Sequence, residues 1–143
     1  MLVMVKVLHI GVAAAWFGHK LLIPGDFDRS LTVQPLADGL VRRMRTAERL
    51  GIGAGLGTVL TGVILVFMTT GWSDLPARIW IGLGAALMMV LIGASLARPA
   101  WMRIQASVEE GALREAQERA VFFKRTLAAE NVLWIIALTA MVF

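Results

Sequence analysis

The first apolar segment of the chain, LVMVKVLHIGVAAAWFGHKLLIP, contains two lysines and two histidines. Ionisable groups at membrane depth are unfavourable, so those that are retained usually face a partner, a cofactor or a water path. At helical spacing Lys6, His9, Trp16 and Lys20 fall on one side of this segment. His9 is therefore a candidate ligand that faces inward, with a cation one turn away.

The chemistry that best suits His9 is ligation of haem iron, because imidazole is the usual axial ligand of b-type haem. Lys6 lies close to His9 in the sequence, and Arg78 begins the third apolar segment on the same side of the membrane. These two cations can pair with porphyrin carboxylates, while Trp16 packs against the ring. The alternative is a structural histidine that forms a hydrogen bond with a neighbouring backbone or hydroxyl group.

A second group of polar residues is predicted to meet at the other end of the apolar segments. His19 lies ten residues beyond His9, about 15 Å along a helix, so the two imidazoles cannot bind one metal together. The residues of similar depth are His19, Lys20, Glu48, Arg49, Arg98, Glu130 and Asn131. They form either a structural network of ion pairs or a proton path from the cytoplasm to a buried redox centre.

The elements that must position these residues are membrane-spanning helices. The 143 residues are 58% hydrophobic and only 17% charged, with a mean hydropathy of +0.74, which is far from the composition of soluble proteins. About 20 apolar residues span a bilayer. Four windows qualify: residues 2–23, 50–70, 79–97 and 127–143. The predicted fold class is all-α integral membrane, a single domain that is a bundle of four transmembrane helices.

Basic residues set the predicted orientation of this bundle. Of the fourteen lysines and arginines, six lie in residues 20–49 and six in residues 98–125. By the positive-inside rule both stretches are cytoplasmic, which places both termini and the turn at residues 71–77 on the other side. A bacterial inner (plasma) membrane fits this pattern. The net charge of +4 thus has a topological explanation, and no nucleic-acid partner is predicted.

The two basic connections are predicted to differ. Residues 24–47 begin with the turn-prone PGDFDRS, and LADGLVRRMRTAERL follows as a short amphipathic helix that leads into the second span. Residues 99–125 read as helical extensions of the third and fourth spans that bend at Gly111. The chain has no cysteine, which excludes disulfides, thiolate ligands and cysteine nucleophiles.

Glycines cluster at the start of the second span, GIGAGLGTVLTG, as Gly51xxxGly55 and Gly53xxxGly57. Small residues allow membrane helices to approach closely, so packing is the simplest interpretation. A glycine face also leaves room for a flat ring such as a porphyrin. The sequence leaves both interpretations open.

Three of these segments resemble one family. VKVLHIGVAAAWFGHKLLIP is similar to the first helix of HemJ-type protoporphyrinogen oxidases and the related CopD-like membrane proteins, and AERLGIGAGLGTVLTGVILV and FKRTLAAENVLWII resemble the entries to their second and fourth helices. The resemblance implies a four-helix membrane protein that binds b-type haem through His9, with Glu130 at the position of a family glutamate. HemJ proteins also depend on a lysine early in the third helix, where RIWIGLGAALMMV offers only Arg78, and His19 stands where the family commonly has a small residue.

The leading functional hypothesis is a haem-binding or porphyrin-handling membrane redox protein, whose partners are the lipid bilayer and a porphyrin or quinone. Whether it is an enzyme, and with which substrate, stays open at this point. One alternative is a non-catalytic membrane subunit or homo-oligomer that associates through its glycine faces. Another is copper transport, as the CopD-like resemblance suggests.

Overall fold

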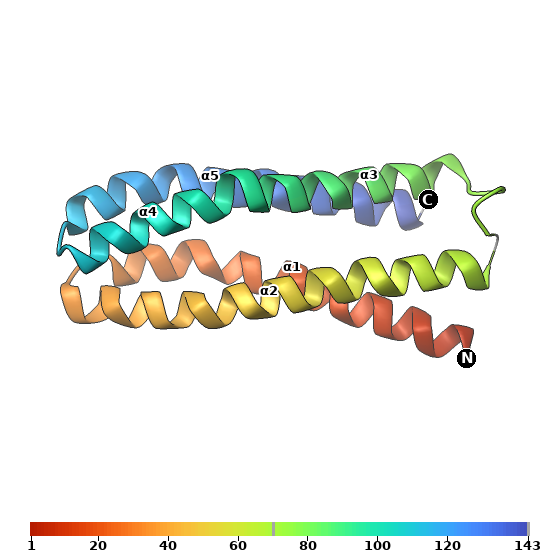
Figure 1. Ribbon diagram of the computed structural model, residues 1–143, viewed down its shortest axis with the longest axis horizontal. Coiled ribbons are helices and arrows are strands. Elements are labelled where there is room, and N and C mark those ends of the chain that lie inside the picture. Colours follow the sequence, from red (N-terminus) through yellow and green to blue (C-terminus); the bar gives the residue numbers. More distant parts are fainter. Residues whose placement is uncertain (70, 143) are drawn as a thin grey trace.

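The computed structural model describes residues 1–69 and 71–142, and the regular structure within these residues is all helical. Helices α1 (Leu2–Ser30) and α2 (Gln34–Met68) are joined by a turn at residues 31–33. Helix α3 (Ala77–Ile92) continues through the π-helical segment η1 (Gly93–Ala97) into α4 (Arg98–Glu109), which makes one rod of 33 residues. Helix α5 (Leu113–Val142) completes four long helical rods that run side by side (Figure 1).

The four rods form two pairs. Helices α1 and α2 pack against each other as an antiparallel pair, and α5 packs along α3 and α4 as the second pair (Figure 1). Both marked termini and the connection at residues 71–76 lie at one end, while the turns at residues 31–33 and 110–112 lie at the other. The two basic stretches of the sequence therefore meet at a single end, which we call the basic end.

Three helical rods are long and apolar enough to cross a membrane: Leu2–Ser30, Gln34–Met68 and Ala77–Glu109. They contain the first and third predicted spans and residues 50–68 of the second. The fourth predicted span lies within α5, which is not among the three. The final residues of the second and fourth predicted spans, Thr70 and Phe143, lie outside the described residues.

The largest hydrophobic core lies at the basic end. Phe27 of α1 is almost fully buried there, with its ring centroid 5.2 Å from that of Phe123 and 5.8 Å from that of Trp101. All four rods contribute to this core, whose buried members are Ile23, Phe27, Leu31, Ala37, Leu40, Val41, Met44, Ala97, Ala100, Trp101, Ile104, Val108, Ala116, Ala120, Phe123 and Leu127. Burial of this apolar surface holds the two pairs together.

The predicted turn at PGDFDRS is wrong, because α1 continues through Pro24 to Ser30. Proline in a helix removes one backbone hydrogen bond, which disfavours this continuation locally. Continuing the helix carries Phe27, Ser30 and then Leu31 to buried positions at the basic end. The apolar burial of Phe27 and Leu31 therefore outweighs the turn propensity of Pro24 and Gly25.

The amphipathic helix LADGLVRRMRTAERL leads into the second span as predicted, and the two form one continuous helix, α2. Its amphipathic character is confirmed, since Ala37, Leu40, Val41 and Met44 are buried while the arginines between them are exposed. This spacing of three and four residues turns one face of α2 to the core.

The predicted bend at Gly111 is confirmed. Gly111 has φ +74°, the Gly111 N–H donates to the Val108 carbonyl at 3.0 Å, and the Ala112 N–H donates to the Ser107 carbonyl at 2.8 Å. This pair of bonds is the Schellman arrangement that ends a helix, and its left-handed position favours glycine. The α4–α5 turn is thus encoded locally.

Side-chain hydrogen bonds tie the turns of the basic end to one another. Gln34 Nε2 donates to the Val108 carbonyl at 2.8 Å, and so is a second donor, besides the Gly111 N–H, to a carbonyl near the end of α4. Arg43 of α2 forms two hydrogen bonds of 2.8 Å with the Asp26 carboxylate of α1. This bidentate contact lowers the pKa of Asp26 below its ordinary value.

Candidate functional site

A cavity of about 580 Å³ lies between the two helix pairs, on the side of the core that faces away from the basic end. Trp16 of α1 and Trp101 of α4 are among its aromatic walls, and most of its other lining is aliphatic. Its polar lining comprises His19, Lys20, Glu48, Arg98 and Glu130. The size and the combination of an apolar body with a few convergent polar groups are typical of a ligand site.

The apolar part of the cavity opens sideways between α2 and α3. Leu56 of α2 and Leu87 of α3 line it, and their exposed fractions are 67% and 59%. Helix α2 packs mainly on α1, and α3 mainly on α5, so little contact closes the gap between α2 and α3. In a bilayer this opening faces lipid.

The polar end of the cavity is organised by a buried ion pair. Lys20 Nζ of α1 lies 2.5 Å from Glu130 Oε2 of α5, and the exposed fractions of the two side chains are 14% and 2%. Lys20 Nζ also lies 5.1 Å from the centroid of the Trp16 ring, within the range of a cation–π contact. The pair links α1 directly to α5.

The other carboxylate oxygen of this pair has no hydrogen-bond partner. Glu130 Oε1 is buried and unsatisfied among the described residues. A Cβ added to Gly93 would lie 3.1 Å from it, so the missing side chain of Gly93 leaves the space beside this oxygen. Gly93 is also the first residue of η1, and such π-helical turns within α-helices occur frequently at functional sites.

His19 occupies the α1–α2 side of the same cavity. Its Nδ1 lies 3.2 Å from the Ala15 carbonyl, to which it donates. In the neutral ring this leaves Nε2 as an acceptor. A Cβ added to Gly51 would approach His19 Nε2 to 2.9 Å, so the imidazole depends on glycine at that position.

Two predicted members of the polar cluster lie at its margin. Glu48 Oε1 is 3.7 Å from Arg98 Nε, and this pair joins α2 to α4 at the rim of the cavity. Arg49 is exposed and does not line the cavity. Five of the seven predicted cluster residues therefore line the cavity, and Arg49 and Asn131 do not.

His9 lies outside the cavity, on the α1–α2 interface. The Thr61 hydroxyl donates to the Gly57 carbonyl at 2.6 Å and lies 2.8 Å from His9 Nδ1. Because the hydroxyl has only one proton, it accepts from the Nδ1–H of His9, and the neutral ring keeps a lone pair on Nε2. This orientation suits a ligating imidazole.

The inward face predicted for α1 is largely confirmed. His9 and Lys20 are partly buried and Trp16 is buried, whereas Lys6 is exposed. Arg78 at the start of α3 is exposed as well. Among the predicted cofactor residues His9, Lys6, Trp16 and Arg78, only Trp16 lines the cavity.

Rings of three α1 side chains pack against glycines of α2. Added Cβ atoms at Gly51, Gly55 and Gly62 would lie 2.9, 3.3 and 3.3 Å from atoms of His19, Trp16 and His9, respectively. The packing interpretation of the glycine cluster is thus confirmed at Gly51 and Gly55, while Gly53 meets no atom within 4 Å. Gly51 and Gly55 also line the cavity, so close packing and room for a ligand coexist.

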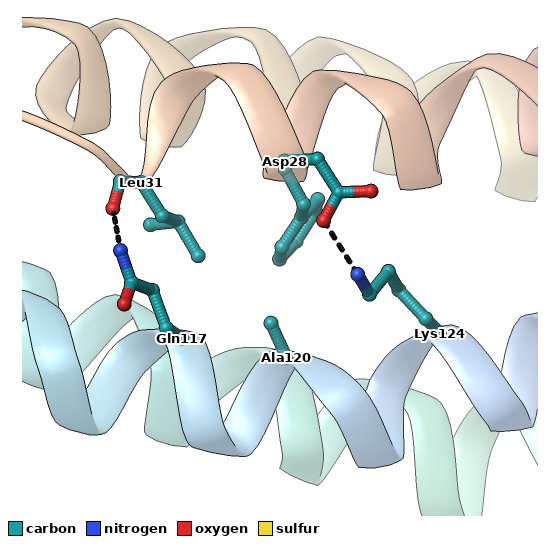
Figure 2. A pocket seen from close by; sticks show the side chains of 6 residues that line it. Asp28, Leu31, Gln117, Ala120 and Lys124 are labelled. Carbon is teal, nitrogen blue, oxygen red and sulfur yellow. Dashed lines mark hydrogen bonds and ion pairs between the residues drawn. The ribbon is translucent and has the colours of Figure 1, made fainter.

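A smaller cavity of about 230 Å³ lies at the basic end between α1 and α5. Figure 2 shows it closed on two sides by polar contacts, from Lys124 to Asp28 and from Gln117 to the Leu31 carbonyl, each 2.5 Å long. Ala120 leaves the space between them. These contacts are explained as structural links between the two helices.

Sequence reasoning missed two contributors to the site. Gly93 was not distinguished from the other small residues of the third span, and nothing in GASLA signals a π-helical turn. Trp101, in the segment predicted as a cytoplasmic extension, closes the cavity. Its position just after Pro99 at the end of an apolar span is a signal that could have marked it.

Comparisons with protein families, with curated proteins and with solved structures find no match to this chain. Among the described residues, no group of three or more His, Asp or Glu side chains is arranged to hold a metal ion. That finding concerns ions held by side chains alone, and a haem iron needs only one imidazole from the protein. The function is therefore inferred from the geometry of the site.

Proposed function

We propose that this chain is a four-helix integral membrane protein that binds haem or a related porphyrin in the cavity between its helix pairs. The observation that carries the proposal is the cavity itself, which combines about 580 Å³ of mainly apolar space with a polar end. A porphyrin has the same division into an apolar ring and charged carboxylates. The cations of the polar end are Lys20 and Arg98, which pair with Glu130 and Glu48 and would exchange these partners for the porphyrin carboxylates.

The length and apolar composition of three rods support a membrane placement. Helix α5 packs along α3, which belongs to a rod that is apolar enough to cross, so we propose that α5 crosses as the fourth span. The positive-inside rule then places the basic end in the cytoplasm and both termini outside. The sideways opening between α2 and α3 would admit a membrane-dissolved ligand directly.

His9 is the proposed ligand of the haem iron, and because it lies on the α1–α2 interface beyond the lining of the cavity, a ligated ring would extend past that lining toward Gly62. The hydrogen bond of His9 with Thr61 fixes the imidazole and leaves Nε2 free. On α2 the cavity extends to Val59, and Gly62, against which His9 packs, is three residues further, about 5 Å along the helix. A bound haem would supply one-electron redox chemistry, while the chain orients the imidazole, excludes water with apolar walls and holds carboxylates through cations.

A second imidazole, that of His19, is also a candidate ligand of the haem iron. His19 lines the cavity and also presents a free Nε2. His9 is preferred because a hydroxyl partner fixes its tautomer at 2.8 Å, whereas the His19 contact is a longer one of 3.2 Å to its own helix. The specific oxidation of protoporphyrinogen is not proposed, because the third helix lacks the lysine of the resembling family.

The test is an absorption spectrum of detergent-solubilised protein produced with ample haem. We expect a Soret band in wild type, its loss or a strong shift in His9→Ala, and retention of most of it in His19→Ala. A band that disappears only in His19→Ala would move the ligand to the polar end of the cavity. A wild-type protein without a Soret band, and without binding of metal-free porphyrin, would overturn the proposal and favour a non-catalytic subunit.

A further inference from the structure

The polar end of the cavity contains a buried hydrogen-bond acceptor that nothing in the described chain satisfies. Glu130 is 2% exposed, and Lys20 approaches only its Oε2. Glu130 lines the cavity, and its Oε1 remains without a donor. A buried polar atom without a hydrogen bond is unfavourable, and few such atoms persist in native proteins without a reason.

The neighbouring backbone leaves space at this oxygen. A methyl group at position 93 would lie 3.1 Å from Glu130 Oε1, so glycine there avoids a close contact with the acceptor and leaves the adjoining position empty. The π-helical turn of η1 begins at the same residue. Space beside an unsatisfied acceptor is what a ligand with a donor group requires.

The charges around Glu130 indicate which kind of donor fits. Lys20 already balances the carboxylate at 2.5 Å, and Arg98 is paired with Glu48 at the rim. His19 on α1 offers a second acceptor, its Nε2. The pocket therefore needs a hydrogen-bond donor and does not need an additional cation.

We propose that Glu130 Oε1 anchors a neutral hydroxyl or N–H group at the polar end of a membrane-dissolved amphiphile. The apolar body of that molecule lies along the aliphatic walls and enters through the opening between α2 and α3, where Leu56 and Leu87 are exposed. This inference goes beyond the proposed function, because an ionised porphyrin carboxylate offers no hydrogen-bond donor to Glu130 Oε1. It rests on the proposed function only in taking the cavity to be a ligand site.

The experiment compares two probes that differ only in the donor. 4-Octylphenol carries one hydroxyl, and 4-octylanisole has a methyl group in place of its proton. Binding to the full chain in lipid nanodiscs is followed by quenching of tryptophan fluorescence, because Trp16 and Trp101 line the cavity. A hydrogen bond to a charged acceptor predicts about 10-fold tighter binding of the phenol.

Two variants tie the preference to Glu130 Oε1. Gly93→Ala obstructs this oxygen without changing charge and should reduce the preference to within about 2-fold, since most of the hydrogen bond would be lost. Its matched control is Gly84→Ala, because an added Cβ at Gly84 meets no atom within 4 Å. The double variant Lys20→Met/Glu130→Met removes the acceptor and its counter-ion together and should abolish the preference.

The control for that double variant is Arg114→Met/Glu118→Met, which removes an ion pair that is almost fully exposed. It should leave the preference at its wild-type value. Equal affinities of wild type for the two probes, or a preference that survives Lys20→Met/Glu130→Met, would overturn the inference and leave Glu130 Oε1 as a site for water alone. Absence of a Soret band together with a phenol preference would refute haem binding and still support the donor site.

Discussion

The buried Lys20–Glu130 pair gives the sharpest prediction about stability. Lys20 Nζ lies 2.5 Å from Glu130 Oε2, and the side chains are 14% and 2% exposed. Replacing one partner of such a pair strands a buried charge, which typically destabilises a protein by about 3–5 kcal/mol. Lys20→Met and Glu130→Met should each lower the free energy of unfolding by roughly this amount.

The double variant should recover most of the loss. Replacing both members of a buried pair with apolar side chains of similar volume is often neutral or stabilising. The predicted coupling energy is therefore at least about 3 kcal/mol in a double-mutant cycle. The Lys20 contact with Trp16 is lost in both variants that lack Lys20, so it cancels from the coupling.

The assay is reversible unfolding in mixed micelles with increasing dodecyl sulfate, followed by tryptophan fluorescence and by far-ultraviolet circular dichroism. The exposed pair Arg114–Glu118 serves as the control cycle and should give no measurable coupling. If both single variants lose less than about 1 kcal/mol, or if the double variant loses the sum of the two, water reaches the pair and the buried-charge reasoning is refuted.

Three further predictions test packing, electrostatics and topology. Gly51→Ala should lower the unfolding midpoint, because the new Cβ would lie 2.9 Å from His19 Nε2, whereas Gly53→Ala, with open space around it, should be neutral or stabilising. Arg43 lowers the pKa of Asp26, so this carboxylate stabilises the fold above its ordinary pKa, and the contribution disappears as pH falls through the lowered value. Asp26→Asn should accordingly be less stable at pH 7 and less sensitive to acid in the same unfolding assay, and an unchanged pH profile would exclude the contact as a source of stability. Ser73→Cys, in a chain without other cysteines, should react with an impermeant maleimide only from the non-cytoplasmic side, and exclusive reaction from the cytoplasm would invert the orientation.

The helices and the inward face of α1 were predictable because each depends on a strong periodic or compositional signal. Apolar windows of membrane length identified the regions of the four rods, and helical spacing placed His9, Trp16 and Lys20 on one face. The similar depths of Lys20 and Glu130 followed from counting residues along adjacent spans. Their contact at 2.5 Å confirms the placement.

The location of the first turn and the details of the site were not predictable, because they depend on contacts between distant segments. Local propensity favoured a turn at Pro24, but burial of Phe27 against Trp101 and Phe123 extends α1 to Ser30. The space left by Gly93 beside Glu130 requires knowing how η1 packs on α5. No spacing within a single segment encodes either feature.

The cavity lies where it does because the helices pack tightly at the basic end and loosely along their apolar halves. Water drives apolar side chains together, whereas lipid provides no comparable force between membrane helices. On the proposed orientation, the core around Phe27 forms in the cytoplasmic part of the bundle, and the apolar halves of α2 and α3 can stay apart because lipid or a ligand contacts their exposed leucines. The Lys20–Glu130 pair lies at the boundary between the packed core and the cavity. Glu130 lines the cavity and comes three residues after the core residue Leu127. A polar anchor at that boundary is positioned by the rigid core and remains reachable from the bilayer, which is the combination that an amphiphilic ligand requires.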